Sequence, residues 1–137
     1  MKILKGDRMP KVIGVVGTRK RDGPKDFLKV FKKFKSLYKK GDSICSGLCP
    51  EGGDRFAVII ADIYKLPKKK RLWFPADCEK YGNSAGFIRN TPIAETSDIM
   101  IACVAKNRKG GTEDTIKKWK KFHKDDCNLE IDDLHII

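Results

Sequence analysis

The sequence predicts an α/β fold: a single Rossmann-like domain over residues 1–137, with a mostly parallel sheet and helices on both faces. Short apolar runs alternate with segments of about 12 to 20 residues that have helical periodicity, an order typical of repeated βα units. Glycines follow several of the runs, as expected at turns between strand and helix. No internal repeat or linker divides the chain, and residues 1–10 are expected to form an N-terminal extension.

The first predicted strand is the apolar run Lys11–Val16, which has the composition of a central parallel strand. Gly17, Thr18 and Arg19 follow it directly. In open α/β sheets, ligands bind at the carboxyl ends of the strands. We therefore expect a tight turn, a hydroxyl group and a guanidinium group at that edge, where the arginine could pair with a phosphate through two hydrogen bonds.

The next segment predicts a helix that begins at Pro24 and ends at Gly41, since proline suits a first helical turn and glycine ends helices. Lysines cover much of its surface. Its large apolar residues recur on one face and are expected to pack in the core rather than to stack on bases; they are Phe27, Phe31, Phe34 and Leu37 or Tyr38.

The stretch Ser43–Tyr64 combines a strand, a glycine loop and a helix. The strand Ile44–Cys45 leads into a loop with Gly47, Gly52 and Gly53. The helix is predicted from apolar residues at helical spacing, namely Phe56, Ile59, Ile60 and Ile63. Backbone amides at a helix N-terminus lack intrahelical partners, so this junction suits a phosphate or another anionic group. A plain tight βα turn would use the same glycines.

A third strand is predicted at Leu72–Phe74, followed by a polar segment that contains several glycines. This segment is expected to lead into a helix that aims Arg89 and Asn90 toward the same sheet edge as Arg19. The apolar run Asp98–Ala105 is the fourth predicted strand.

Gly110, Gly111 and Thr112 follow the fourth strand and open another predicted helix, which Thr112 is expected to cap. One face of that helix carries the apolar residues Ile116, Trp119 and Phe122. The alternating pattern of Leu129–Ile137 predicts a last strand.

The positive charge is concentrated at one end of the chain. The net charge is +12, and residues 1–40 carry 14 Lys and Arg against three acids, whereas residues 41–137 carry 16 against 15. The N-terminal third is thus a candidate surface for a polyanion, although lysines on a solvated helix face are an alternative explanation.

Neither a membrane span nor a metal site is predicted. No run approaches the roughly 18 apolar residues that a span needs, and the N-terminus is too polar for a secretory signal, so we expect a cytoplasmic protein. The five cysteines include no Cys-x-x-Cys pair and are expected to be buried or half-buried free thiols; they are Cys45, Cys49, Cys78, Cys103 and Cys127. No cofactor is predicted.

A series of short motifs resembles the YspA-like branch of the SLOG superfamily, which groups the DNA-processing Smf/DprA proteins with the LOG-type phosphoribohydrolases. The resemblance extends from about Val12 to Ile116. It implies a Rossmann-like fold with a nucleotide-type pocket along the carboxyl edge of the sheet. The motifs are Gly17-Thr18-Arg19, Ser46-Gly47, Gly53-Asp54-Arg55-Phe56-Ala57, Phe74-Pro75-Ala76-Asp77, Tyr81-Gly82, Ala85-Gly86, Arg89-Asn90 and Gly111-Thr112.

The chain departs from these families at several positions. Cys78 stands where the YspA-like branch usually has tryptophan, and the loop Leu48–Gly52 is longer than usual. LOG-type enzymes carry a Pro-Gly-Gly-x-Gly-Thr-x-x-Glu motif, whose glutamate takes part in N-glycosidic chemistry. The glycines and threonine match here, but Glu113 directly follows the threonine, so Glu113 and Asp114 are both candidate catalytic acids.

Three functions follow as hypotheses. The first is binding of a nucleotide-type small molecule, as a sensor or processing domain. The alternatives are hydrolysis of a nucleotide N-glycosidic bond and weak, non-specific binding of single-stranded nucleic acid through the basic N-terminal region; a homo-oligomer is left open. The candidate ligand-binding residues are Gly17, Thr18, Arg19, Ser46, Gly47, Gly52, Gly53, Asp54, Arg55, Asp77, Tyr81, Arg89, Asn90, Gly110, Gly111 and Thr112.

Several candidates have a structural alternative. Asp54 or Asp77 could accept hydrogen bonds from ribose or a base, or cap the helix that follows. Arg55 could instead pair with Asp62 or Glu51 at the surface.

The same holds for Asn90 and Tyr81. Asn90 could hold the loop shape instead of contacting ligand. Tyr81 could stack on a base or cover the outer wall of the pocket.

Overall fold

The computed structural model describes residues 8–123 and 133–137. Its strands are β1 (Val12–Gly17), β2 (Ser43–Ser46), β3 (Arg71–Trp73), β4 (Ile99–Cys103) and β5 (Leu134–Ile136). Its α-helices are α1 (Pro24–Leu37), α2 (Gly53–Ile63), α3 (Cys78–Tyr81), α4 (Ala85–Thr96) and α5 (Gly111–Phe122), and two short 3₁₀ turns lie at Lys68–Lys70 (η1) and Gly82–Ser84 (η2).

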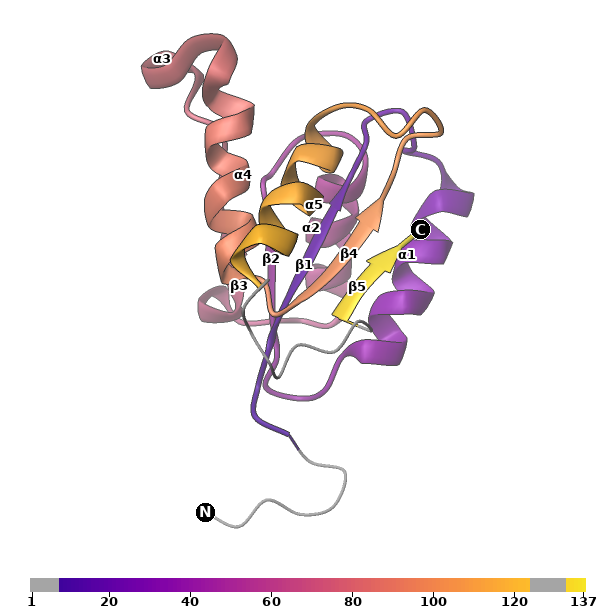
Figure 1. The fold of residues 1–137 in the computed structure, drawn as a ribbon. Coiled ribbons are helices and arrows are strands. Elements are labelled where there is room, and N and C mark those ends of the chain that lie inside the picture. Colours follow the sequence, from indigo (N-terminus) through magenta and orange to yellow (C-terminus); the bar gives the residue numbers. More distant parts are fainter. Residues whose placement is uncertain (1–7, 124–132) are drawn as a thin grey trace.

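The strands form one parallel sheet in the order β3-β2-β1-β4-β5. Helices α1 and α2 cover one face, and α4 and α5 cover the other, while α3 lies away from the sheet beyond the N-terminal end of α4 (Figure 1). The predicted Rossmann-like α/β class is confirmed. Because the chain leaves β1 and β4 toward opposite faces, the loops after these neighbouring strands separate at the carboxyl edge.

Both faces of the central strands are buried, which explains their continuous apolar runs. Along β1, Ile13 and Val15 pack among residues of α1 and α2, whereas Val16 packs toward α4 and α5. In β4, Ile101 and Met100 divide between the two faces in the same way. The aromatic stripe of α1 contributes the buried Phe34 and partly buried neighbours to this core, as predicted.

Several predicted boundaries differ from the structure. Helix α1 ends at Leu37, because Tyr38 is extended, and Gly41 lies in the turn after it with φ of +101°. Ile63 at the end of α2 is 51% exposed, and Phe122 at the end of α5 is 47% exposed, so neither belongs to the core face. In the predicted last strand, Leu134–Ile136 is β5, and residues 129–132 lie outside the described part.

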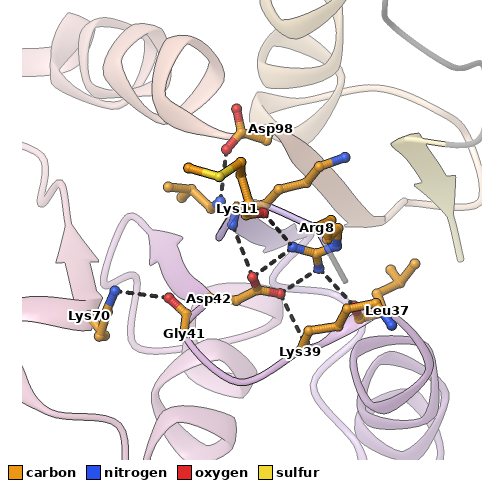
Figure 2. Close-up of polar contacts among 10 residues, drawn as sticks. Arg8, Lys11, Leu37, Lys39, Gly41, Asp42, Lys70 and Asp98 are labelled. Carbon is orange, nitrogen blue, oxygen red and sulfur yellow. Dashed lines mark hydrogen bonds and ion pairs between the residues drawn. The ribbon is translucent and has the colours of Figure 1, made fainter. Parts of the chain in front are cut away.

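A buried carboxylate joins the elements at the amino edge of the sheet. Asp42 accepts two hydrogen bonds from the guanidinium of Arg8, at 2.8 and 2.6 Å, and one each from the backbone amides of Lys11 and Lys39 (Figure 2). Arg8 also donates to the carbonyl of Leu37. This cluster connects the segment before β1, the end of α1 and the start of β2 at the edge opposite to the ligand-binding edge of such folds.

Among the cysteines, Cys45 and Cys103 are buried free thiols, as predicted. Cys49 is half-buried, as predicted, whereas the prediction for Cys78 is wrong because this residue is exposed; Cys127 lies outside the described residues. Within the described ranges, no helix is long and apolar enough to cross a membrane, and no group of three or more metal-ligating side chains occurs.

Candidate functional site

A cavity of about 520 Å³ lies at the carboxyl edge, where the loops after β1 and β4 separate. This volume is within the range of small-molecule sites. The predicted site residues that line it are Gly17, Thr18, Arg19, Asp54, Arg89, Asn90, Gly110, Gly111 and Thr112. The predicted residues that do not line it are Ser46, Gly47, Gly52, Gly53, Arg55, Asp77, Tyr81, Glu113 and Asp114.

The N-terminus of α5 opens into this cavity. Gly110 is the N-cap residue, with φ of +113° and no side-chain hydrogen bond to the helix, and the helix begins at Gly111. The predicted capping role of Thr112 is therefore wrong, since Thr112 lies inside the first turn. The first amides of a helix lack intrahelical acceptors and carry the positive end of the helix dipole. The cavity thus contains a helix N-terminus that favours negative charge, and the first turn of this helix also carries the acids Glu113 and Asp114.

Three basic side chains surround this helix end. Arg19 and Lys20 come from the loop after β1, and Lys109 comes from the loop before α5. All three residues are exposed, and none forms an ion pair with another described residue. An anion in the cavity would therefore meet cations that are not paired with any carboxylate in the described part of the chain.

The inner wall of the cavity is built around the buried carboxyl group of Asp54. Its Oδ1 lies 2.9 Å from the hydroxyl of Ser46, and its Oδ2 accepts a hydrogen bond from the backbone amide of Cys49. The Arg89 guanidinium lies 3.7 Å from Oδ2. Burial raises the pKa of Asp54, and the positive charge of Arg89 is the strongest influence in the opposite direction. Asp54 is not a helix cap but a buried acid in the wall.

Asn90 connects this wall to the N-terminus of α5. Its Oδ1 accepts from the guanidinium of Arg89, and its Nδ2 donates to the carbonyl of Gly111 and to the carboxylate of Asp114. Asp114 is held in turn by Lys118 at 2.8 Å. These contacts support the alternative role of Asn90, which is to hold the local structure. Asn90 also lines the cavity.

The N-terminus of α2 is already occupied by a side chain of the protein. The backbone amide of Gly52 donates to Oδ1 of Asp22 at 2.7 Å. Arg55 donates to the same oxygen at 2.7 Å and to the carbonyl of Asp22. The partner of Arg55 is therefore Asp22 rather than Asp62 or Glu51. The Gly52 amide and Arg55 together lower the pKa of Asp22.

The glycines of this loop make room for neighbouring backbone. A Cβ atom on Gly53 would lie 2.2 Å from the carbonyl carbon of Val16, and one on Gly52 would lie 2.3 Å from the carbonyl oxygen of Thr18. Gly47 faces the Arg89 guanidinium, which donates to its carbonyl at 2.6 Å. These contacts support the plain βα turn as the reason for Gly52 and Gly53.

The remaining predicted residues are engaged elsewhere. Glu113 pairs with Arg108 through two hydrogen bonds, at 2.8 and 2.9 Å. Asp77 caps α3 by accepting from the amide of Lys80, which was one of its two alternatives. Tyr81 is 40% exposed and lies against the ammonium group of Lys80.

Other cavity residues carry little signal in the sequence. Phe87 and Asn83 come from the N-terminal end of α4 and the turn before it, and Asn107 comes from the loop after β4. Phe87 is 53% exposed, and the sequence alone does not indicate this exposure. The sequence carries no signal for Asp22 either, because its partner lies 30 residues away in the chain.

Comparison with known proteins identifies a shared fold. No family model and no curated protein matches the chain. Among solved structures, it is similar to DNA processing protein A from Helicobacter pylori, described for its unique single-stranded DNA binding mode, with a TM-score of 0.62 and 20% identity. The match covers 84% of this chain and 63% of that chain, so this chain spans less than two thirds of its length. At this identity, the similarity establishes the fold.

Proposed function

We propose that the cavity binds a nucleotide-type small molecule, with the phosphate group at the N-terminus of α5. The observation that supports this most strongly is the uncapped end of α5 at Gly110, which faces the cavity beside Arg19, Lys20 and Lys109. Helix N-termini bind phosphate through free backbone amides, and nearby cations strengthen the attraction. The resemblance of the sequence motifs to the SLOG superfamily implies the same ligand class.

The rest of the cavity suits the organic part of such a ligand. Phe87 and Ile93 contribute apolar surface, and Asn83 and Asn107 offer amide groups that can both donate and accept hydrogen bonds. A mostly apolar wall with a few polar groups is typical of small-molecule sites. We place the base or sugar on this side of the cavity.

Binding is favoured over hydrolysis. The candidate catalytic acids Glu113 and Asp114 are held by Arg108 and by Asn90 with Lys118, and neither acid lines the cavity. A general acid or base has to lie within hydrogen-bond reach of the reacting group. Glu113 and Asp114 are therefore not placed to act on a ligand in the cavity. The acid that does line the cavity, Asp54, is engaged by Ser46, Cys49 and Arg89, and we propose a binding domain, in keeping with a role as a sensor.

Calorimetry with a nucleoside and its 5′-monophosphate tests this proposal. The monophosphate should bind at least about tenfold more tightly than the nucleoside, because only the phosphate reaches the end of α5. Arg19→Gln should weaken the monophosphate more than the nucleoside. Lys69→Gln is the matched control, since Lys69 is an exposed cation in η1, which directly precedes β3 at the opposite edge. Equal affinities for the two compounds would refute the phosphate site.

Single-stranded nucleic acid is a second candidate ligand. The structure of similar fold was described for its single-stranded DNA binding mode. In this chain, Lys25, Lys29 and Lys32 are exposed and recur at the spacing of one face of α1. Three contacts with single strands would give a slope of about −2 for log affinity against log salt, so binding should be weak at physiological salt.

Filter binding with an oligonucleotide of mixed sequence measures this second activity. Replacing Lys25, Lys29 and Lys32 with glutamine should flatten the salt dependence and leave nucleoside monophosphate binding unchanged. The same change on α5, at Lys117, Lys120 and Lys121, is the control for non-specific loss of charge. Salt-resistant, sequence-selective binding would promote nucleic acid above the small molecule.

A further inference from the structure

The acid in the cavity wall has an unusual hydrogen-bond environment. Among the described residues that line the cavity, Asp54 is the only acid, and it is 5% exposed. The hydroxyl oxygen of Ser46 lies 2.9 Å from Oδ1 of Asp54 and 2.5 Å from the carbonyl oxygen of Val15. The hydroxyl oxygen of Ser46 is therefore within hydrogen-bond distance of both the Asp54 carboxyl group and the Val15 carbonyl group.

Counting the hydrogens that these three groups can share gives each contact its own hydrogen only if Asp54 carries a proton. A serine hydroxyl has a single hydrogen to donate, and a backbone carbonyl has none. The short contact between Ser46 and Val15 therefore uses the serine hydrogen. The contact between Ser46 and Asp54 then needs a hydrogen of its own, and the carboxylic acid form of Asp54 supplies it by donating to the serine oxygen.

The contacts of Arg89 agree with a neutral partner. Its guanidinium donates to the carbonyl of Gly47 at 2.6 Å and to Oδ1 of Asn90 at 3.1 Å, and both acceptors are uncharged. The distance of 3.7 Å between its Nη2 and Oδ2 of Asp54 is too long for a hydrogen bond. Arg89 lines the cavity and keeps 17% of its side chain exposed. Its positive charge is thus available to a ligand.

We infer that Asp54 is a protonated acid in the ligand-free protein, so that Arg89 acts as an uncompensated cation for an anionic ligand group, and that ionisation of Asp54 weakens anion binding. This inference rests on the proposed function, because it concerns how the same cavity selects an anion. It makes the site proton-linked: a proton on Asp54 and an anion beside Arg89 favour one another, since removing the proton would place two negative charges side by side.

Burial raises the pKa of Asp54, and Arg89 is its strongest opposing influence. The neighbouring thiol of Cys45 adds no negative charge, because burial raises its pKa to about 12. The other titratable or charged groups that line the cavity come from three loops: Cys49 after β2, Arg19 and Lys20 after β1, and Lys109 before α5. Two ion pairs lie near them, Asp22–Arg55 at the start of α2 and Asp114–Lys118 beside Asn90.

The first test measures the protonation of Asp54 without any ligand. The ¹³C chemical shift of its carboxyl carbon should report the acid form well above the pH at which an ordinary aspartic acid ionises, at about 3.9. Titration at or below that ordinary value would overturn the inference. This measurement uses the unaltered protein and does not depend on whether the cavity binds anything.

The second test measures coupling with sulfate, whose charge is constant between about pH 5 and pH 9. Sulfate affinity should decrease by up to tenfold per pH unit once Asp54 ionises, the limit for one linked proton. In Asp54→Asn, which cannot ionise and can still donate to Ser46, this pH dependence should disappear, whereas Arg89→Gln should lose affinity at every pH. The same pH dependence in Asp54→Asn would overturn the coupling. Lack of binding at every pH would refute the proposed anion site, and the carboxyl titration would still decide the protonation state.

Discussion

Asp22 Oδ1 accepts a hydrogen bond from the Gly52 backbone amide at 2.7 Å, so the protein's own carboxylate occupies the N-terminus of α2. Helices α2 and α5 both begin after strands of the sheet, and both have a glycine as N-cap residue, Gly52 and Gly110. They differ in that a carboxylate accepts from the amide of Gly52, whereas no described carboxylate accepts from the amide of Gly110. This difference is the reason for proposing the anion site at α5 rather than at the glycine loop that precedes α2.

Asp22→Ala should separate these two helix ends. We expect a lower melting temperature, because Gly52 and Arg55 lose their shared acceptor. Nucleoside monophosphate affinity should remain within about twofold of the parent, since Asp22 does not line the cavity. Calorimetric titration and thermal unfolding measure the two effects. A loss of affinity as large as that of Arg19→Gln would mean that the ligand reaches α2.

Gly53→Ala should destabilise the fold. The new Cβ atom would lie 2.2 Å from the backbone of β1, which cannot move without disturbing the central strand. Overpacking of this kind costs about 1 to 3 kcal/mol or more in the free energy of unfolding. Gly86→Ala in α4 is the matched control, because a Cβ atom there meets nothing within 4 Å and alanine favours a helix. Urea denaturation of both variants gives the comparison, and equal stabilities would contradict this packing.

Asp42→Asn should remove a pH-dependent contribution to stability at the amino edge (Figure 2). Burial alone would raise the pKa of Asp42, but the hydrogen bonds from Arg8, Lys11 and Lys39 outweigh it, and the net shift is downward. A lowered pKa in the folded protein stabilises the fold above the ordinary aspartic acid value. That contribution disappears as the pH falls through the folded value.

The cost of Asp42→Asn at neutral pH should be about 3 kcal/mol, typical of breaking a buried ion pair. Urea denaturation at about pH 7 and about pH 3 should show a large difference between variant and parent at the higher pH and a smaller one at the lower pH. A difference that is independent of pH would contradict the role of the Asp42 charge.

Glu113→Gln should have little effect on the cavity. Its carboxylate pairs with Arg108 and lies outside the lining, so we expect nucleoside monophosphate affinity within about twofold of the parent. A nucleotide panel should release no free base with either protein. Release of base by the parent, with a loss of at least about a hundredfold in Glu113→Gln, would establish hydrolysis instead.

The sequence predicted the sheet because its strands are buried on both faces. Runs such as Lys11–Val16 and Asp98–Ala105 contain no polar residue after their first position, and this pattern is typical of a strand covered by helices on both sides. The ends of the helices were predicted less accurately. The predicted end of α1 at Gly41 was wrong, because the chain leaves the helix four residues earlier and Gly41 serves a separate turn.

The sequence predicted those site residues that the topology brings to the carboxyl edge of the sheet. Arg19, Arg89 and Gly110 each lie near the carboxyl edge of a parallel sheet, so their shared location follows from the topology. The pairing of Asp22 with Gly52 depends instead on how two loops fit together. No sequence pattern indicates the contact between Asp22 and Gly52. Without that contact, nothing in the sequence favoured the N-terminus of α5 over that of α2 as the anion site.

Mapping a nucleoside 5′-monophosphate onto the protein by amide NMR tests the central claim most directly. The account predicts that the largest shift changes occur at the amides of Gly110, Gly111 and Thr112, with smaller changes at Thr18 and Arg19 and none at Gly52. A nucleoside without phosphate should leave the end of α5 unaffected. Changes centred on Gly52 and Gly53, or on the lysine face of α1, would contradict the account.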